Sequence, residues 1–241
     1  VKLIENHENL GIKGRNIGYR AACGRLVLSL DDDIELVDPG TIERVESTFD
    51  GDAGLAAITL KIIEEETGDE FVPHHWWHPR DRLECQNDAF ETDTINEAAV
   101  AFDAAALARA GYYYEELFWG GEEWDLVLGL LDAGYTIRYE PIPARHLAPR
   151  GNLNLKADPR HALLVRNRFW IAFRRLDLFS ALKVVVPRLL FWLGRSIRHG
   201  YFTDFLRGLL DLARRSPTIR RDRRPISAET KRRLRAIRAA R

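Results

Sequence analysis

Three adjacent aspartates, Asp31, Asp32 and Asp33, follow a short apolar segment at residues 26–30. Neighbouring carboxylates repel one another, so a cation that they share lowers the free-energy cost of keeping them ionised. Hard oxygen ligands of this kind select Mg²⁺, Mn²⁺ or Ca²⁺. The alternative is a solvated acidic turn, since aspartate is common in turns. The triplet therefore predicts a divalent-metal site, with coordination positions left open for the phosphates of a nucleotide.

A second acidic pair, Glu122 and Glu123, follows two glycines in "FWGGEEWDL" at residues 118–126. Glycine allows a backbone to approach a ligand closely, and the start of a helix favours negative charge. Acidic residues at a helix start are also ordinary capping chemistry, which is the alternative for an isolated pair. Beside a metal site, the pair becomes the candidate for a general base.

The elements that position the aspartates are predicted from the first 30 residues. Residues 1–6 alternate weakly like a strand, and residues 9–24 form a glycine-punctuated loop that leads into a short helix closing on Gly24. The run "RLVLSL" follows as a strand whose near-continuous apolar character suits a sheet covered on both faces. This order predicts a parallel βαβ unit with the aspartates at the carboxyl end of its second strand, where ligands bind.

The rest of the acidic half alternates between helical and strand patterns. We expect helices at 38–49 and 122–136, strands at 53–63 and 137–147, and a short strand followed by a helix ending at Gly111 within 96–118. The long segment 64–93 is polar and aromatic, with "HHWWHP" at its centre. Its three histidines are too close together for a structural zinc site and no cysteine accompanies them. We expect this segment to stack on an acceptor substrate or to form a lid.

The chain of 241 residues has a formal net charge of zero, but its two halves differ. Residues 156–241 contain 23 Lys and Arg against 6 Asp and Glu, a net charge of +17, and the preceding residues carry −17. The basic half is helical in period and rich in Leu, Phe and Trp, which predicts either helices packed on the body or a surface that meets anionic lipid. Nucleic acid is not expected as a partner, because residues 220–241 have no aromatic side chain for base stacking.

Two domains are therefore expected: an α/β catalytic domain at 1–158 and a basic amphipathic helical tail at 159–241. Cys23 and Cys85 form no disulfide framework, and no signal peptide is recognisable, which predicts a cytoplasmic protein, peripheral at the inner face of the cell membrane. The chain has no methionine and opens on Val1 in what looks like the middle of a strand. We expect that the first strands of the domain are lacking.

The combination of "NLGIKGRNIGYRAACGRLVLSLDDD" with "AAVAFDAAALARAGYYYEELFWGGEEWDLVLGLLDAGYTIRYEP" resembles the inverting glycosyltransferases of family 2. The resemblance runs from Val1 to about Arg175, and "RRPISAETKRRLR" at 223–235 is similar to the C-terminal ends of some members. It implies a GT-A type, Rossmann-like α/β fold. Such a fold has a mixed, mostly parallel sheet flanked by helices, here with a C-terminal basic helical extension.

The resemblance also implies roles for the acidic residues. The family's DxD-type motif falls on the triplet, where Asp33 would bind Mg²⁺ or Mn²⁺, Asp31 would reach the ribose or the metal's water shell, and Asp32 would belong to the same donor site. The family's acidic pair falls on Glu122 and Glu123, with Glu123 as the general base. The second position of that pair is more often Asp in the family.

Three further residues have two interpretations each. Arg15 and Asn16, in the glycine-rich loop, would contact the donor or stabilise the start of a helix. His146 stands where some related transferases have a third metal ligand, and its alternative is a structural or surface role.

The function implied is a metal-dependent inverting transfer of a hexosyl or deoxyhexosyl group from a nucleotide sugar to a glycan or lipid-linked saccharide, in polysaccharide biosynthesis. One alternative is a nucleotidyl- or phospho-transferring enzyme that uses the same aspartates, although such an enzyme needs a basic phosphate clamp. Another is a non-catalytic, membrane-peripheral protein that binds saccharide or acts as a scaffold.

Overall fold

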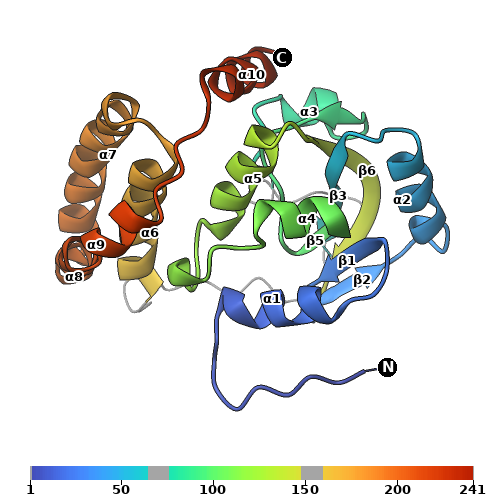
Figure 1. Ribbon diagram of the computed structural model, residues 1–241, viewed down its shortest axis with the longest axis horizontal. Helices are drawn as coiled ribbons and strands as arrows, with labels where there is room; N and C mark the ends of the chain where they lie inside the picture. The colour runs from blue at the N-terminus through green and yellow to red at the C-terminus, as the bar shows by residue number, and fades with distance from the viewer. Residues whose placement is uncertain (1, 65–75, 148–159, 241) are drawn as a thin grey trace. The chain divides into compact units, whose positions relative to one another are not determined.

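The computed structural model describes residues 2–64, 76–147 and 160–240, which form two compact units (Figure 1). The helical unit comprises the described residues of Val1–Asn16, Tyr113–Asp125 and Asn152–Ile226. The sheet unit comprises those of Ile17–Tyr112, Leu126–Gly151 and Ser227–Arg241. The boundary predicted between residues 158 and 159 falls at the edge of a segment outside the described residues and stays a prediction.

The sheet unit is built on a mixed six-stranded sheet flanked by helices. Its strands are β1 (Leu26–Leu30), β2 (Ile34–Leu36), β3 (Leu55–Glu64), β4 (Phe90–Glu91), β5 (Ala99–Asp103) and β6 (Thr136–His146). Their order is β1-β5-β3-β6-β2, with β4 paired to β6. The central strands β3 and β5 supply the core, in which Ile58 and Val100 have no exposed surface. The α/β class and the strands expected at 53–63 and 137–147 are thereby confirmed.

The expectation of a mostly parallel sheet is wrong. Among the described strands only β3 and β6 pair in parallel, whereas β1 with β5, β3 with β5, β2 with β6 and β4 with β6 are antiparallel. The reason is the position of β5, which runs between β1 and β3 in the opposite direction to both. A regular alternation of strands and helices in the sequence does not reveal such an insertion.

The predicted βαβ unit at the start of the chain is also wrong. Residues 2–6 are irregular, and Leu3 is 77% exposed, so no first strand is formed. The helix α1 (Ile12–Ala21) and the strand β1 do follow as expected. However, β1 pairs only with β5 among the described strands and is half-buried along most of its length, not covered on both faces.

The connection between β1 and β2 forces the sheet to curl. These strands stand at the two ends of the five-strand order, and in a flat sheet four spacings of about 4.8 Å would separate them by about 19 Å. The chain from Leu30 to Ile34 reaches at most about 14 Å. A turn in which the Ile34 N–H donates to the Asp31 carbonyl at 3.2 Å shortens it further. The two ends of the sheet therefore meet at the aspartate triplet, which joins β1 to β2.

A bend in β6 contributes to this curl. Its register with β3 shifts between Leu60, opposite Glu140, and Lys61, opposite Pro143, so that two extra residues of β6 are accommodated. Pro141 and Pro143 lack N–H groups and interrupt a regular ladder, which is the usual setting of a bulge.

The helices α2 (Thr41–Asp50) and α4 (Ala104–Ala110) confirm the helical predictions for this region. On α2 the buried residues Thr41, Val45 and Phe49 recur every four positions, so one stripe faces the core. The α4 helix begins where the Asp103 carboxylate accepts from the Ala106 N–H at 2.7 Å. It ends at Gly111, whose φ of 90° is left-handed.

The last helix, α10 (Ala228–Ala239), belongs to the sheet unit. The carboxylate of Asp132, the last residue of α5 (Glu122–Asp132), accepts from the Ser227 N–H and from the Thr230 hydroxyl, each at 2.7 Å. Arg233 donates to the Tyr135 carbonyl at 2.8 Å, and Arg238 donates to Asp93 at 2.6 Å. Part of the basic C-terminal sequence is therefore used to attach this helix to acidic and carbonyl groups of its own unit.

The helical unit contains α6 (Arg160–Arg175), α7 (Leu178–His199), α8 (Phe202–Arg214) and α9 (Ser216–Arg221), together with the short 3₁₀ helix η3 (Glu115–Leu117). A core of Val165, Phe169, Ala172, Val185 and Phe205 holds α6, α7 and α8 together. None of the helices in the described part of the chain is long and apolar enough to cross a bilayer.

Replacement of Asp132 by alanine tests the attachment of α10. The change leaves the Ser227 N–H and the Thr230 hydroxyl without their acceptor, so we expect the free energy of unfolding to fall by about 1–3 kcal/mol in a denaturant titration. The matched control is Glu46→Ala, an exposed acidic residue on α2, which should change it by less than about 0.5 kcal/mol. Equal effects of the two substitutions would contradict this account of the helix.

Candidate functional site

The aspartate triplet is held at both ends by the backbone of the sheet unit. The Asp31 N–H donates to the Ala98 carbonyl at 3.0 Å, at the end of the β1–β5 ladder. The Asp33 carbonyl accepts from the Leu147 N–H at 2.7 Å, just beyond β6. Asp31 and Asp33 are half-buried and Asp32 is exposed. The carboxylates therefore project from a fixed turn at the carboxyl ends of β1 and β6, as the position of the triplet after a strand predicts.

The structure brings His146 to the triplet. Its Nε2 lies 3.3 Å from Oδ2 of Asp33, and the two side chains are 20% and 38% exposed. Two ligand atoms of one ion with bonds of about 2.1 Å lie about 3 Å apart, so this pair fits a shared divalent cation with little movement. A mixed nitrogen and oxygen donor set suits Mn²⁺ better than Mg²⁺, which prefers oxygen alone. The contact favours the metal-ligand interpretation of His146.

The acidic pair Glu122 and Glu123 opens α5 after a turn that requires glycine. Gly120 and Gly121 have φ values of 91° and 89°. A Cβ on Gly120 would lie 2.7 Å from a methyl carbon of Leu164, and one on Gly121 would lie 3.1 Å from that of Ile171. Both the conformation and the close approach to α6 exclude larger residues. The two glycines thus fix the position at which α5 begins, and with it the position of the acidic pair.

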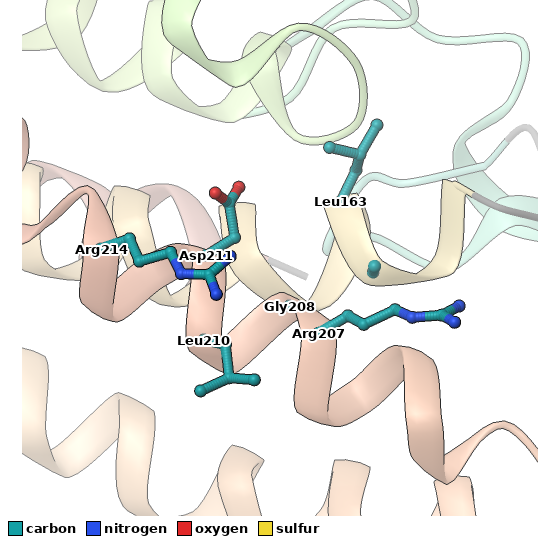
Figure 2. Close-up of a pocket in the computed structure, with 7 residues that line it drawn as sticks. Leu163, Arg207, Gly208, Leu210, Asp211 and Arg214 are labelled. Atoms are coloured by element: carbon teal, nitrogen blue, oxygen red, sulfur yellow. The ribbon is translucent and has the colours of Figure 1, made fainter.

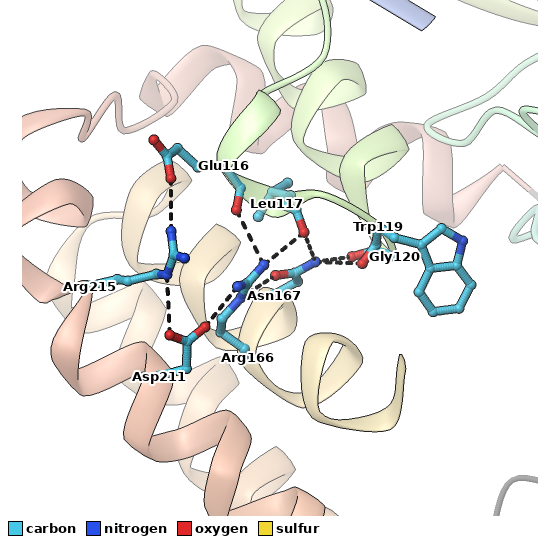
Figure 3. Close-up of polar contacts among 8 residues, drawn as sticks. All are labelled: Glu116, Leu117, Trp119, Gly120, Arg166, Asn167, Asp211 and Arg215. Carbon is cyan, nitrogen blue, oxygen red and sulfur yellow. Dashed lines mark hydrogen bonds and ion pairs between the residues drawn. The ribbon is translucent and has the colours of Figure 1, made fainter. Parts of the chain in front are cut away.

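Two buried residues of α6 hold this turn through its carbonyl groups (Figure 3). The Asn167 side-chain amide donates to the carbonyls of Leu117, Trp119 and Gly120 at 2.8–2.9 Å. Arg166 donates to the Leu117 carbonyl at 2.7 Å and to Asp211 of α8 at 2.8 Å. Because these carbonyls belong to an irregular segment, the α6 side chains replace the hydrogen bonds that a helix or strand would provide.

Asp125, in the first turn of α5, carries a buried cluster of charges. Its side chain is 1% exposed and accepts from Arg174 Nη1 at 2.6 Å with both oxygens. Arg175 donates to the same carboxylate from Nε at 2.9 Å and from Nη2 at 2.8 Å. The fork of Arg175 is the strong bidentate arrangement, and the buried charges compensate one another. This cluster anchors the start of α5 to the end of α6.

Burial raises the pKa of both members of the acidic pair. For Glu122 the cause is loss of solvation and then the neighbouring Glu123 carboxylate, and its pKa is raised to about 7. Loss of solvation likewise raises the pKa of Glu123, while the Arg168 charge opposes the rise. Oε2 of Glu122 is buried with no hydrogen-bond partner among the described residues. The pair can therefore hold a proton near neutral pH and exchange it, as a general base must.

Arg15 and Asn16 have different surroundings, both within the helical unit. The charge of Arg15 lowers the pKa of Glu122, which places its guanidinium near the acidic pair. Asn16 is fully buried, donates to the Tyr113 carbonyl at 2.8 Å and accepts from the Tyr113 N–H at 3.1 Å. These contacts favour the structural interpretation of Asn16, while donor contact by Arg15 stays a prediction.

The described part of "HHWWHP" contains a structural histidine. His74 and His75 lie outside the described residues. Nδ1 of His78 lies 2.7 Å from the Thr92 hydroxyl and 2.9 Å from that of Thr94, and burial lowers its pKa to about 3. Trp76 and Tyr139 pack against it with their ring edges. His78 is therefore a neutral core residue, whereas the exposed Trp77 keeps the predicted acceptor-stacking role open.

The metal candidates Asp31, Asp32, Asp33 and His146 belong to the sheet unit, and Glu122, Glu123, Arg15 and Asn16 belong to the helical unit. Sequence reasoning missed Asp125, Arg166 and Asn167, which support the acidic pair. The sequence places Asp125 three residues after Glu122, but the arginine partners of Asp125 lie about 50 residues away and no local pattern indicates them. A cavity of about 410 Å³ between α6 and α8, lined by Leu163, Arg207 and Arg214, contains none of the predicted residues (Figure 2).

No protein-family model and no curated protein matches the chain. Among solved structures, it is similar to GalNAc-T7 with UDP, GalNAc and Mn²⁺, with a TM-score of 0.54 and 16% identity over 75% of this chain and 37% of that one. The mannosyltransferase PcManGT from Pyrobaculum calidifontis, in complex with GDP-Man and Mn²⁺, has a TM-score of 0.49 and 16% identity over 99% of this chain and 61% of that one. S. aureus TarS (1-349) has a TM-score of 0.46 and 14% identity over 95% of this chain and 70% of that one.

The similarity to GalNAc-T7 shows a fold of the GT-A glycosyltransferase type, and at this identity it shows the fold alone. The chain spans 37% of the length of GalNAc-T7 and 61% of that of PcManGT. The expected GT-A type of fold is thus confirmed, apart from the strand directions corrected above.

Substitution of Asp125 by alanine tests the charge cluster at the start of α5. The change leaves the buried guanidinium groups of Arg174 and Arg175 uncompensated, so we expect the free energy of unfolding to fall by about 3–5 kcal/mol in a denaturant titration. Asp204→Ala is the control, because Asp204 pairs with Arg207, whose side chain is 74% exposed, and this pair should contribute about 1 kcal/mol or less. A small effect of Asp125→Ala would show that the cluster is not stabilising.

The raised pKa of Glu122 predicts how stability depends on pH. The native state keeps a proton that the unfolded chain releases between the ordinary pKa of 4.5 and about 7, so this carboxyl makes the wild type less stable as pH rises through that window. Glu122→Gln removes the penalty and should raise the free energy of unfolding by about 1–3 kcal/mol near pH 8. Near pH 4 the difference should vanish. Glu46→Gln, on the exposed face of α2, should show no such pH dependence.

Proposed function

We propose that this chain is an inverting glycosyltransferase of family 2 that uses a nucleotide-sugar donor and a divalent cation. The observation that carries the proposal is the approach of His146 to Asp33, at 3.3 Å, on the turn that closes the sheet of a GT-A type fold. GalNAc-T7 was solved with UDP and Mn²⁺, and PcManGT with GDP-Man and Mn²⁺. A nucleoside-diphosphate sugar is accordingly the class of donor that we propose.

Asp33 and His146 would hold the ion, and Asp31, half-buried beside them, would reach the ribose or a water of the ion. When bound, the ion, Mn²⁺ or Mg²⁺, would supply positive charge that stabilises the leaving diphosphate. The backbone contacts of Asp31 and Asp33 hold the turn that carries these side chains before the donor arrives, so little backbone ordering is needed on binding.

Glu123 would act as the base. In an inverting transfer the acceptor oxygen forms its bond to the anomeric carbon on the side opposite the leaving diphosphate, and its proton passes to a carboxylate. A carboxylate whose pKa is raised toward neutral accepts that proton more readily than an exposed one. Loss of solvation raises the pKa of Glu123, and Asp125, Arg166 and Asn167 hold the segment in position.

The acceptor that we propose is the hydroxyl of a growing glycan or of a lipid-linked saccharide. The transferred group is a hexosyl or deoxyhexosyl residue. The exposed Trp77, 61% accessible, offers an aromatic face on which a sugar ring can stack.

A donor-consumption assay tests these roles. With Mn²⁺ and a panel of UDP-, GDP- and dTDP-sugars, we expect the wild type to release the nucleoside diphosphate from one donor class. Glu123→Gln should lower kcat by about 10²–10⁴-fold with little change in the affinity for Mn²⁺. Asp33→Asn and His146→Ala should weaken the Mn²⁺ affinity itself by at least about tenfold. The control Glu46→Gln, on the exposed face of α2, should behave as the wild type.

Two outcomes would contradict the proposal. Activity unchanged in both Glu123→Gln and Asp33→Asn would remove both assigned roles. Release of pyrophosphate from a nucleoside triphosphate, with no consumption of nucleotide sugars, would assign the aspartates to nucleotidyl transfer.

A further inference from the structure

The helix α7 has two apolar faces, of which only one packs on its own unit. Ala181 and Val185 are buried, with Leu189, Trp192 and Leu193 packed against the core of α6 and α8. A second set of large apolar side chains is exposed by 44–67% of its surface: Phe179, Leu182, Val186, Leu190 and Ile197. These five recur at spacings of three, four, four and seven residues, so they form one continuous stripe along the helix.

Cations accompany this stripe, which we call the α7 stripe. Lys183 borders it, with its ammonium group 4.2 Å from the centre of the Phe179 ring. Arg198, exposed next to Ile197, forms no ion pair within the described residues. Residues 160–226 contain 16 Lys and Arg against 4 Asp and Glu, a net charge of +12. An apolar stripe on so basic a segment suits a partner that is apolar within and negatively charged at its surface.

The start of α7 adds an apolar recess beside the stripe. Leu178, 57% exposed, lines a cavity of about 390 Å³ together with Phe173, Leu209, Leu212 and Ile219. Arg220 and Arg223 belong to the same lining. The recess thus combines apolar walls with guanidinium groups, just as the stripe combines apolar side chains with cations.

We propose that the α7 stripe binds the surface of a bilayer that contains anionic lipids. The helix lies in the plane of the interface, its Phe, Leu, Val and Ile side chains enter the boundary between headgroups and acyl chains, and Lys183 and Arg198 meet lipid phosphates. Each cation near an anionic bilayer adds to the attraction, and the sum is screened by salt. A symmetric dimer through the stripe is less favoured, because it would bring the basic segments 160–226 of two copies together.

This inference is independent of the proposed reaction, since it rests on exposed side chains of α7 and on charge alone. A membrane surface would concentrate the enzyme where lipid-linked saccharides are found. The binding itself requires neither the donor nor the acidic pair.

Vesicle co-sedimentation tests the proposal with the full chain. We expect the wild type to pellet at low salt with vesicles of phosphatidylcholine mixed with phosphatidylglycerol, far less with phosphatidylcholine alone, and less again at high salt. The double variant Phe179→Glu/Leu190→Glu should bind the mixed vesicles at least about tenfold more weakly. The matched control, Ile42→Glu/Leu83→Glu, makes the same change at exposed apolar residues of α2 (Thr41–Asp50) and α3 (Arg82–Cys85) and should bind as the wild type.

Circular dichroism checks that both double variants are folded, and Leu190→Ser provides a milder change should the glutamates destabilise α7. Equal binding of the wild type to neutral and anionic vesicles, or equal losses in the two double variants, would overturn the proposal. So would a wild-type dimer that Leu190→Ser converts to monomer without vesicle binding, because the stripe would then join two copies. Glu123→Gln should bind vesicles normally, so failure of the proposed chemistry and failure of this inference are distinguishable.

Discussion

The candidate metal site depends on one geometric constraint, which is that three residues must join the first and last strands of a five-strand order. Asp31, Asp32 and Asp33 span a gap that a flat sheet would make too wide, so the sheet curls and its ends meet at the triplet. The same curl carries the end of β6 to this turn. His146 therefore reaches Asp33 as a consequence of strand order and chain length, and backbone hydrogen bonds hold the segments that carry the two side chains.

The acidic pair is supported in a different way, by buried polar contacts. The turn before α5 has no regular ladder, and Asn167 and Arg166 satisfy its carbonyls from the neighbouring helix. Asp125 then ties the first turn of α5 to two arginines at the end of α6. Such clusters are costly to bury unless every partner is present, but they specify one arrangement. Burial also raises the pKa values of Glu122 and Glu123. The polar contacts that support the turn and the raised pKa values of the acidic pair therefore both follow from burial.

The basic C-terminal sequence is divided between two uses. In α10, arginines such as Arg233 and Arg238 donate hydrogen bonds to acidic and carbonyl groups of the sheet unit. In α7, Lys183 and Arg198 lie beside exposed apolar side chains instead. Net charge alone does not distinguish these situations, because an arginine paired with a carboxylate and an arginine facing water count equally in the sequence.

The sequence by itself determined the local elements and the chemistry of the candidate residues. Helical periodicity and glycine located α2, α4 and α5, and an apolar run ending in aspartates located β1 and the triplet, because these signals act between residues close in the chain. Only the tertiary structure decided the strand directions, the meeting of His146 with Asp33, and the support of Glu122 and Glu123 by Asp125 and Asn167. These contacts join residues separated by about 50 to 110 positions, and a single sequence carries no periodicity at that range. The insertion of β5 between β1 and β3 likewise depends on which edges are buried together, which packing alone resolves.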